Sequence, residues 1–240
     1  MENKKVIIID ASSGIGRALA HKFSKNGYDV GLVSRRVHLL NEISEELDTN
    51  CYVKQIDVTE EESAMKKMET LLKEMVDIDI IILNAGAGRR NHEVKWEEEK
   101  ITAETNVMGF TAMINKAFHY FKDRGRGHIV GVSSIAGLWG NRYGPAYSAS
   151  KSYVSKYLDG IRNKSIHDGL NIDVTDIIPG FVDTKMAQGK HIFWKASVKK
   201  ASDQIYKAII KKKRKAFITK RWKLIAFLIK IIPDFILDRL

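Results

Sequence analysis

Short runs of β-branched and other apolar residues alternate with helical segments along the chain, and this alternation constrains the fold more than any other feature of the sequence. Strands are predicted at residues 6–9, 29–33, 52–56, 78–83, 128–132, 172–177 and 216–218. Segments with apolar residues at helical spacing lie between these runs, and long helices are expected before and after residues 128–132. Such strict alternation is typical of a parallel sheet with helices on both faces. We therefore predict an α/β fold with a doubly wound, mostly parallel sheet.

The length of the chain suits a single domain. Its 240 residues can bury one substantial core, and its three prolines mark no low-complexity linker or repeat. We expect one domain over residues 1–220 and a basic, apolar helical extension over residues 221–240. The only cysteine, Cys51, cannot form an internal disulfide, and no apolar run long enough for a signal-peptide core follows the first five residues. These features favour a reducing cytoplasm.

The basic charge is confined to the C-terminal part of the chain. The net charge is +11, yet residues 1–184 hold 24 Lys and Arg against 26 Asp and Glu, whereas residues 185–240 hold 16 against 3. The body therefore lacks the charge of a nucleic-acid-binding domain. The basic tail also lacks interleaved aromatic residues and a recognition fold, so nucleic acid is not expected as a partner.

Ligands of doubly wound sheets bind beyond the carboxyl ends of the strands, so the loops there carry the functional information. After the first strand the sequence reads Asp-Ala-Ser-Ser-Gly-Ile-Gly-Arg over residues 10–17. Glycines in such a loop let the backbone approach a pyrophosphate at the N-terminus of the next helix, although Gly and Ser are common in any turn. The candidate pyrophosphate contacts are Ser12, Ser13, Gly14, Ile15 and Gly16.

Basic residues follow the second strand, where the adenosine ribose of a dinucleotide would lie. Ser34 is followed by Arg35 and Arg36, whereas an acidic residue here would bind a free 2′-hydroxyl. Planar guanidinium groups suit a 2′-phosphate, so NADP(H) is expected in preference to NAD(H); the alternative is a solvated charge pair at the start of a helix.

Two further loops supply candidate contacts for the adenosine. Asp57 and Val58 follow the third strand, and the Asp57 carboxylate could accept a hydrogen bond from the adenine amino group. Asn84, Ala85 and Gly86 follow the fourth strand and form a wall of small residues. Each of these loops could equally be an ordinary turn.

Tyr147 and Lys151 lie four residues apart and therefore share one face of a predicted helix. The Lys151 ammonium could stabilise a tyrosinate and lower the pKa of Tyr147 from its usual ~10. With 8 tyrosines and 28 lysines in the chain, this spacing is expected about once by chance, so its position must support the assignment. Ser134 follows the strand at 128–132 and could hold a substrate carbonyl while Tyr147 donates a proton, with Ser133 as the alternative.

Asn106 lies in the helical segment that precedes this strand. A buried amide there could anchor a water molecule next to Lys151, or it could be a helix-packing residue.

Together, these motifs resemble the short-chain dehydrogenase/reductase family in type, order and spacing over residues 4 to about 220. The resemblance rests on Ala-Ser-Ser-Gly-Ile-Gly, Asn-Ala-Gly, Asn106, Ser134, Tyr147 with Lys151, and Pro179-Gly180. It implies a Rossmann-type sheet of about seven strands and hydride transfer between a nicotinamide and a carbonyl or alcohol carbon, without a metal.

The resemblance also implies a role for each of these residues. Tyr147 would be the acid/base, Lys151 would hold the nicotinamide ribose, Ser134 would orient the carbonyl and Asn106 would support a proton relay. The segment from Ile178 to Thr184 would flank the carboxamide of the nicotinamide; its candidate contacts are Pro179, Gly180, Val182 and Thr184.

The glycine-rich loop departs from the family, which usually has Thr-Gly where this chain has Ile9-Asp10. A carboxylate near bound phosphates would repel them, unless Asp10 turns to a ribose hydroxyl or pairs with a neighbour such as Arg35. We expect NADPH binding that is weakened but retained.

The C-terminal segment is more basic and apolar than the family requires. Lys223 and Lys230 interrupt its apolar run and Pro233 ends it, so it is too short to span a bilayer. One interpretation is a helix packed on the core or on another subunit. The other is an interfacial anchor on an anionic membrane, inserting Trp222, Leu224, Phe227, Leu228 and Ile231.

The sequence thus predicts an NADPH-linked ketone reductase or alcohol dehydrogenase with a small-molecule substrate. Candidate pocket walls are Leu138, Trp139, Tyr143, Met186, Phe193 and Trp194, and their apolar character favours a hydrophobic or acyl-chain substrate. By resemblance we expect a homodimer or homotetramer. The alternative function, motivated by Asp10, is a non-catalytic nucleotide-sensing or scaffold protein on the same fold.

Overall fold

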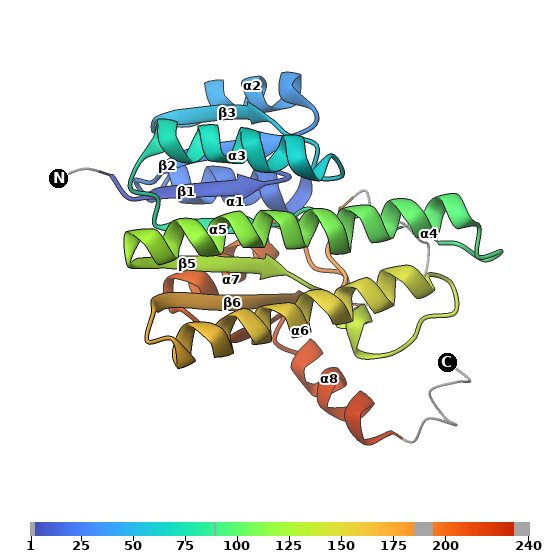
Figure 1. Ribbon diagram of the computed structural model, residues 1–240. Coiled ribbons are helices and arrows are strands. Elements are labelled where there is room, and N and C mark those ends of the chain that lie inside the picture. Colours follow the sequence, from blue (N-terminus) through green and yellow to red (C-terminus); the bar gives the residue numbers. More distant parts are fainter. Residues whose placement is uncertain (1–2, 89, 185–193, 233–240) are drawn as a thin grey trace.

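A seven-stranded, all-parallel sheet forms the centre of the molecule (Figure 1). The computed structural model describes residues 3–88, 90–184 and 194–232. The strand order is β3-β2-β1-β4-β5-β6-β7. The strands are β1 (Lys5–Ile9), β2 (Asp29–Ser34), β3 (Cys51–Gln55), β4 (Ile80–Leu83), β5 (Arg126–Val132), β6 (Asn171–Pro179) and β7 (Lys215–Ile218). Each overlaps a strand predicted from the sequence, and the predicted α/β fold class is confirmed.

Helices cover both faces of this sheet. They are α1 (Gly14–Ser24), α2 (Val37–Glu45), α3 (Glu61–Met75), α4 (Trp96–Ala103), α5 (Phe110–Arg124), α6 (Pro145–His167), α7 (Val198–Ile210) and α8 (Trp222–Ile231). One apolar core lies between the sheet and α3, α5 and α6, and the other lies between the sheet and α1, α2 and α7. Strand β1 shows why both cores form: Ile7 and Ile9 point into the first, and Val6 and Ile8 into the second.

The order of the strands reverses next to β1. Strand β1 pairs with β2 on one side and with β4 on the other, so the chain leaves the middle of the sheet in both directions. The chain therefore continues to opposite sides of the sheet after β1 and β4, and sheets of this kind bind ligands in the crevice outside the carboxyl ends of the strands at this point.

Two short irregular helices complete the fold near this crevice. The first, η1 (Glu104–Gly109), is a π-helical turn that joins α4 to α5, and the second, η2 (Ile135–Leu138), is a 3₁₀ helix after β5. Asn106 was predicted in a helical segment, and it lies in η1. Single π-turns within α-helices are frequent at functional sites.

Helix α8 lies at the end of the described chain and extends away from the sheet in Figure 1. Its inward side packs on η2 in a small apolar cluster that contains Ile135, Trp222 and Ala226. Within the described ranges, no helix has both the length and the apolar character that crossing a bilayer requires, as the sequence predicts for the C-terminal run.

Candidate active site

The loop after β1 has the backbone conformation of a phosphate-binding turn. Helix α1 begins at Gly14, which adopts a positive φ of 55°. A Cβ atom at Gly16 would overlap the Asp10 carbonyl oxygen, so only glycine fits there. The loop thus brings backbone amides to the positive end of α1, which suits a pyrophosphate.

Side chains from three other loops converge on this turn. The Asn84 amide, after β4, donates to the Asp10 carbonyl at 3.1 Å. The Arg36 guanidinium, after β2, donates to the hydroxyls of Ser12 at 2.7 Å and Ser13 at 3.0 Å. After β6, Thr184 lies beside Gly14, where its Cγ2 would be 3.2 Å from an added Cβ. Four loops that are distant in the sequence therefore form one rim.

The two arginines after β2 have different partners. Arg35 is exposed, and its Nη1 lies 3.8 Å from the Asp57 carboxylate, which also accepts hydrogen bonds from the backbone and hydroxyl of Thr59. Arg35 therefore does not form the ion pair with Asp10 that the sequence suggested. Burial raises the pKa of Asp10, and the charges of Arg36 and Arg35 oppose this effect.

Val58 completes the segment after β3. It is buried, and its carbonyl lies so close to Gly109 in η1 that a Cβ atom there would press on it.

Tyr147 and Lys151 lie in the first two turns of α6, on the side facing the loop after β4. Helix α6 begins at Pro145, a favoured first residue because its missing N–H needs no partner there. The Lys151 Nζ lies 5.8 Å from the centre of the Tyr147 ring and donates to the Val132 carbonyl at 3.0 Å. Ser134 caps η2 by accepting from the Ala136 amide, and its hydroxyl lies close enough to Tyr147 to influence the pKa of the phenol.

The protonation of this pair differs from the sequence-based expectation. Burial raises the pKa of Tyr147 above 10, and the hydrogen bond with Ser134 opposes the rise. The expected lowering by Lys151 is not found, because desolvation of the phenol dominates. Burial also lowers the pKa of Lys151 to about 8, against the attraction of Asp176 and Asp10.

Asn106 binds the loop after β4 rather than Lys151. Its side-chain oxygen accepts from the Ala87 amide at 2.7 Å, and its nitrogen donates to the Ala87 carbonyl and to the Ser150 hydroxyl. A Cβ atom at Gly86 would nevertheless lie 3.0 Å from the Lys151 Nζ and 3.7 Å from the Asn106 oxygen. Asn106 and Lys151 thus border the same backbone segment.

Ser133 and Ser134 point to different surroundings. The Ser133 hydroxyl donates to a buried carboxylate, Asp176 of β6, at 2.6 Å, and Ser155 of α6 donates to the other oxygen of Asp176 at 2.6 Å. The Ser133 hydroxyl is therefore hydrogen-bonded within the core. Ser134, in contrast, lies near Tyr147. Asp176 was missed by the sequence analysis, because a single Asp in an apolar strand gives no local sign of its partners.

Two glycines were also missed, and both make room for the Tyr147 and Lys151 turns of α6. A Cβ atom at Gly88 would overlap the Tyr147 ring, and one at Gly137 would lie 2.7 Å from the Lys151 carbonyl carbon. Glycine at these positions could have been found only from the three-dimensional contacts, since neither adopts a positive φ.

The segment after β6 packs against the C-terminal helix. A Cβ atom at Gly180 would overlap the indole of Trp222, and the Gly180 amide donates to the Ile218 carbonyl. Pro179 ends β6, and Val182 is buried in the core beneath α7. Gly180 thus has a packing role in addition to any contact with a nicotinamide.

The predicted pocket walls divide into three groups. Leu138 and Trp139 are half-buried against the cluster of η2 and α8. Tyr143 and Trp194 are exposed, the first beside the ring of His92. Met186 and Phe193 lie outside the described residues.

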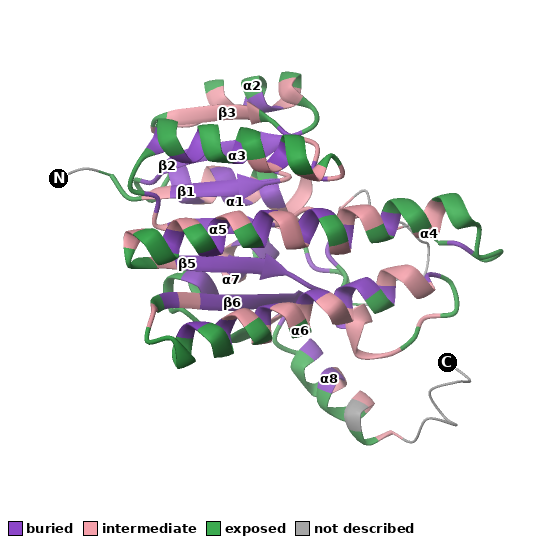
Figure 2. Cartoon of the chain, viewed as in Figure 1, coloured by how far each residue is buried: buried purple, intermediate pink, exposed green. Residues whose placement is uncertain are grey.

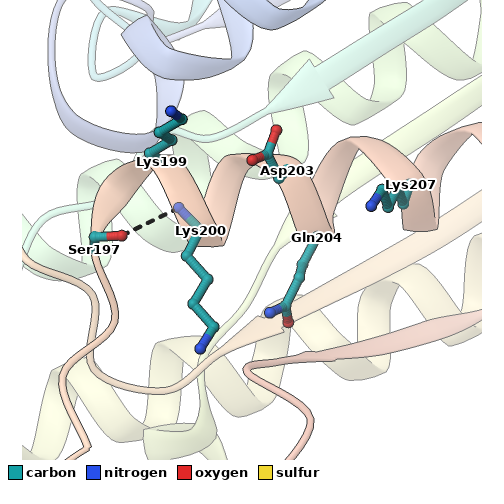
Figure 3. A pocket seen from close by; sticks show the side chains of 6 residues that line it. All are labelled: Ser197, Lys199, Lys200, Asp203, Gln204 and Lys207. Carbon is teal, nitrogen blue, oxygen red and sulfur yellow. Dashed lines mark hydrogen bonds between the residues drawn. The ribbon is translucent and has the colours of Figure 1, made fainter.

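A separate surface hollow lies along α7 and is not part of this site. It is lined by Ser197, Lys199, Lys200, Asp203, Gln204 and Lys207 (Figure 3). These residues extend along α7 from its N-cap, Ser197, to its last turn at Lys207, and three of them are lysines. The hollow therefore belongs to the basic C-terminal part of the chain.

Comparison with protein-family models places the chain among known proteins. Residues 4–192 match the model for the short chain dehydrogenase family. An uncharacterised oxidoreductase of Myxococcus xanthus is 31% identical over 191 residues, covering 78% of this chain and 75% of the relative. An NADP-dependent 3-hydroxy acid dehydrogenase of Escherichia coli is 31% identical over 180 residues, covering 74% of this chain and 72% of the relative.

Solved structures show the same architecture. A short-chain dehydrogenase from Sphingobium yanoikuyae, in complex with NADPH, superposes with a TM-score of 0.80 over 96% of both chains at 22% identity. Serine dehydrogenase from Escherichia coli superposes with a TM-score of 0.74 at 28% identity, over 85% of this chain and 90% of the other.

Proposed function

The chain belongs to the short-chain dehydrogenase/reductase family of NAD(P)-dependent oxidoreductases that act on CH–OH groups, and on that premise we propose that it is an NADP(H)-preferring ketone reductase or alcohol dehydrogenase. One observation carries the proposal. The Tyr147 phenol lies near the Ser134 hydroxyl and the Lys151 ammonium, and Tyr147 and Lys151 border Gly88 and Gly86 of the loop after β4.

Each of these groups has a chemical task in the proposed reaction. A bound nicotinamide supplies or accepts the hydride. Because burial raises its pKa, Tyr147 is protonated near neutral pH and can donate to the oxygen of a carbonyl that is being reduced. Ser134 orients that oxygen, the Lys151 charge stabilises the tyrosinate left behind, and Asn106 holds the adjoining loop.

The arginines after β2 support the preference for NADP(H). Arg36 is held over the glycine-rich loop by Ser12 and Ser13, and Arg35 is exposed beside it, so both can reach a 2′-phosphate. The Escherichia coli relative is named as NADP-dependent. We assign the remaining contacts of the cofactor to Gly14, Ile15, Gly16, Ser34, Asp57, Val58, Asn84, Ala85, Gly86, Pro179, Gly180, Val182 and Thr184.

The substrate is proposed to be hydrophobic or to carry an acyl chain. Leu138 and Trp139 follow Ser134 and are only half-buried against the cluster of η2 and α8, so part of each apolar side chain is accessible near Ser134. The names of the relatives add two polar candidates, 3-hydroxy acids and serine, which a substrate screen should include.

Cofactor preference is tested by following NADPH and NADH fluorescence during titration. We expect saturable binding that is tighter for NADPH. Arg36→Ala should weaken NADPH binding by roughly ten- to a hundredfold, the value of a charge-assisted contact, while changing NADH binding far less. Equal loss for both cofactors would show that Arg36 only supports the loop, and no saturable binding would refute the proposed enzyme.

Turnover is tested on a panel of ketones, secondary alcohols, 3-hydroxy acids and serine with NADPH or NADP⁺. Tyr147→Phe should lower kcat by at least about a hundredfold, the usual contribution of a general acid. The matched control is Tyr206→Phe in α7, whose ring packs on Phe23 in the other core. Cofactor binding without Tyr147-dependent turnover on the panel would favour the nucleotide-sensing alternative.

A further inference from the structure

Helix α8 is apolar on two opposite sides. Trp222, Ile225 and Ala226 form one stripe at helical spacing, and this stripe faces the cluster with η2. The opposite stripe consists of Leu224, Phe227, Leu228 and Ile231, whose exposed fractions are 61%, 61%, 40% and 61%. A surface helix of a globular protein normally carries polar residues on the outward side. In Figure 2, exposed segments alternate with buried and intermediate ones along α8.

Two further aromatic rings are exposed near the start of α8. Phe181 and Trp194 are each more than a third exposed, and their rings contact the Trp222 ring with centroids 5.6 and 6.0 Å apart. They add to the exposed apolar area of this part of the molecule. Exposed apolar surface of this kind marks a site of interaction with a partner.

The surrounding charge identifies the kind of partner. Residues 194–232 contain thirteen Lys and Arg but one acidic residue, Asp203, which is already paired with Lys22 at 2.6 Å. Lys220, Arg221 and Lys223 are exposed at the start of α8. A second copy of the chain would bring the same positive charge to the interface, whereas an anionic surface would neutralise it.

We propose that α8 is an interfacial helix that binds an anionic lipid bilayer by inserting Leu224, Phe227, Leu228 and Ile231 among the lipids. Lys220, Arg221 and Lys223 would lie at the level of the headgroups, as basic residues flanking such helices do. Trp222 takes no part in insertion, because it is buried against Gly180 and η2. The sequence-based expectation that Trp222 enters the membrane is therefore corrected.

The first test is co-sedimentation of the full chain with vesicles. Vesicles of phosphatidylcholine mixed with phosphatidylglycerol should bind the protein at least about tenfold more tightly than phosphatidylcholine alone, and added salt should weaken the difference. No binding to the mixed vesicles, or equal binding to both kinds, overturns the proposal.

The second test separates the two sides of the helix. The double variant Phe227→Ser, Leu228→Ser should lower vesicle affinity roughly tenfold or more per side chain, without lowering the melting temperature, because both residues are exposed. The control is Ile166→Ser in α6, a residue that is 68% exposed on another helix. A chain ended at Lys220 is unsuitable, because it would also remove the buried Trp222.

Light scattering of the same proteins distinguishes a second copy from a membrane. If the double variant has half the molar mass of the unaltered chain, and the unaltered chain does not bind vesicles, α8 is a subunit interface and the proposal is wrong. If vesicle binding is unchanged in the double variant, another surface binds the lipid and the proposal is equally wrong.

Discussion

Asp10 stands at a backbone position that favours glycine, and its conformation explains why an acidic residue is tolerated there. Its φ is 63°, in the left-handed region that Asp and Asn enter more readily than other side chains. The backbone is also held by hydrogen bonds, since the Asp10 amide donates to Val33 and its carbonyl accepts from Asn84. The loop therefore keeps its shape. The unfavourable effect expected of Asp10 is the repulsion between its negative charge and bound phosphates.

Removing the charge of Asp10 should tighten NADPH binding. We expect Asp10→Asn to raise affinity roughly three- to tenfold, because the amide keeps the left-handed conformation without repelling phosphates. Burial raises the pKa of Asp10, so the gain should become smaller as the pH is lowered and the Asp10 carboxyl takes up its proton. The measurement is a fluorescence titration, with the exposed Asp48→Asn as control. Weaker binding by Asp10→Asn would instead indicate that the carboxylate holds a ribose hydroxyl.

His128 links stability to pH. It is buried in β5 with its Nε2 2.8 Å from the Thr175 hydroxyl, and burial lowers its pKa from 6.5 to about 4. Between these values the unfolded chain binds a proton that the folded chain does not. The stability from neutral His128 is therefore complete above pH 6.5 and is lost as the pH falls toward 4.

We expect this residue to lower the free energy of unfolding by about 2 kcal/mol between pH 7 and pH 5. Urea unfolding at both pH values should show a smaller pH effect in His128→Gln, while the exposed His119→Gln should match the unaltered chain. An unchanged pH effect in His128→Gln would contradict the assignment.

At the scale of elements, Asp176 fastens the helix that carries the proposed catalytic pair to the sheet. Its carboxylate on β6 accepts from Ser133 at the end of β5 and from Ser155, one turn after Lys151 on α6. The buried Asp176 carboxylate thus holds the end of β5, which precedes Ser134, in a fixed position relative to the part of α6 that carries Tyr147 and Lys151.

Asp176→Ala should lower the free energy of unfolding by about 2–4 kcal/mol, because two buried hydroxyls lose their acceptor. A suitable control lies on the same strand: Asp173→Ala removes only a half-exposed ion pair with Lys212 and should cost less than about 1 kcal/mol. Denaturant unfolding measures the free energy of unfolding of both variants. Equal losses in the two variants would show that Asp176 does not hold α6 to the sheet.

Helix α8 offers a comparison within a single element. Trp222→Ala should cost about 3 kcal/mol or more, because it leaves a cavity against Gly180 and η2, whereas Phe227→Ala should change stability by less than about 0.5 kcal/mol. Thermal unfolding measures both. Similar effects would mean that the two sides of α8 are equally buried.

At the scale of the whole molecule, the nearly neutral body and the basic C-terminal part meet beside the candidate active site. Helix α8 packs on η2, which directly follows Ser134, and Trp222 packs on the Gly180 turn. A membrane-bound α8 would therefore hold this side of the crevice near the lipid, which agrees with the proposed hydrophobic substrate.

The expected homodimer or homotetramer remains a prediction. Trp96, Ile101 and Met108 are large apolar side chains of α4 and η1 that are about half exposed or more, and an interface would cover them. Light scattering in detergent-free buffer should give two or four times the 27.2 kDa of one chain. A mass of one chain would contradict the prediction.

The sequence by itself determined the order of strands and helices and the loops in which the candidate site residues lie. Those features follow from periodicity over a few residues and from the rule that parallel strands end on one edge, so no distant contact was needed to find Gly14, Tyr147 or Lys151.

Only the tertiary structure decided which neighbouring side chain does what. In the folded chain, Ser133 bonds within the core, whereas Ser134 lies beside Tyr147. Arg36 rather than Arg35 contacts the glycine-rich loop. On α8, Trp222 is buried and Phe227 is exposed. Each of these choices depends on segments that lie far apart in the chain and pack side by side, and local spacing carries no record of that packing.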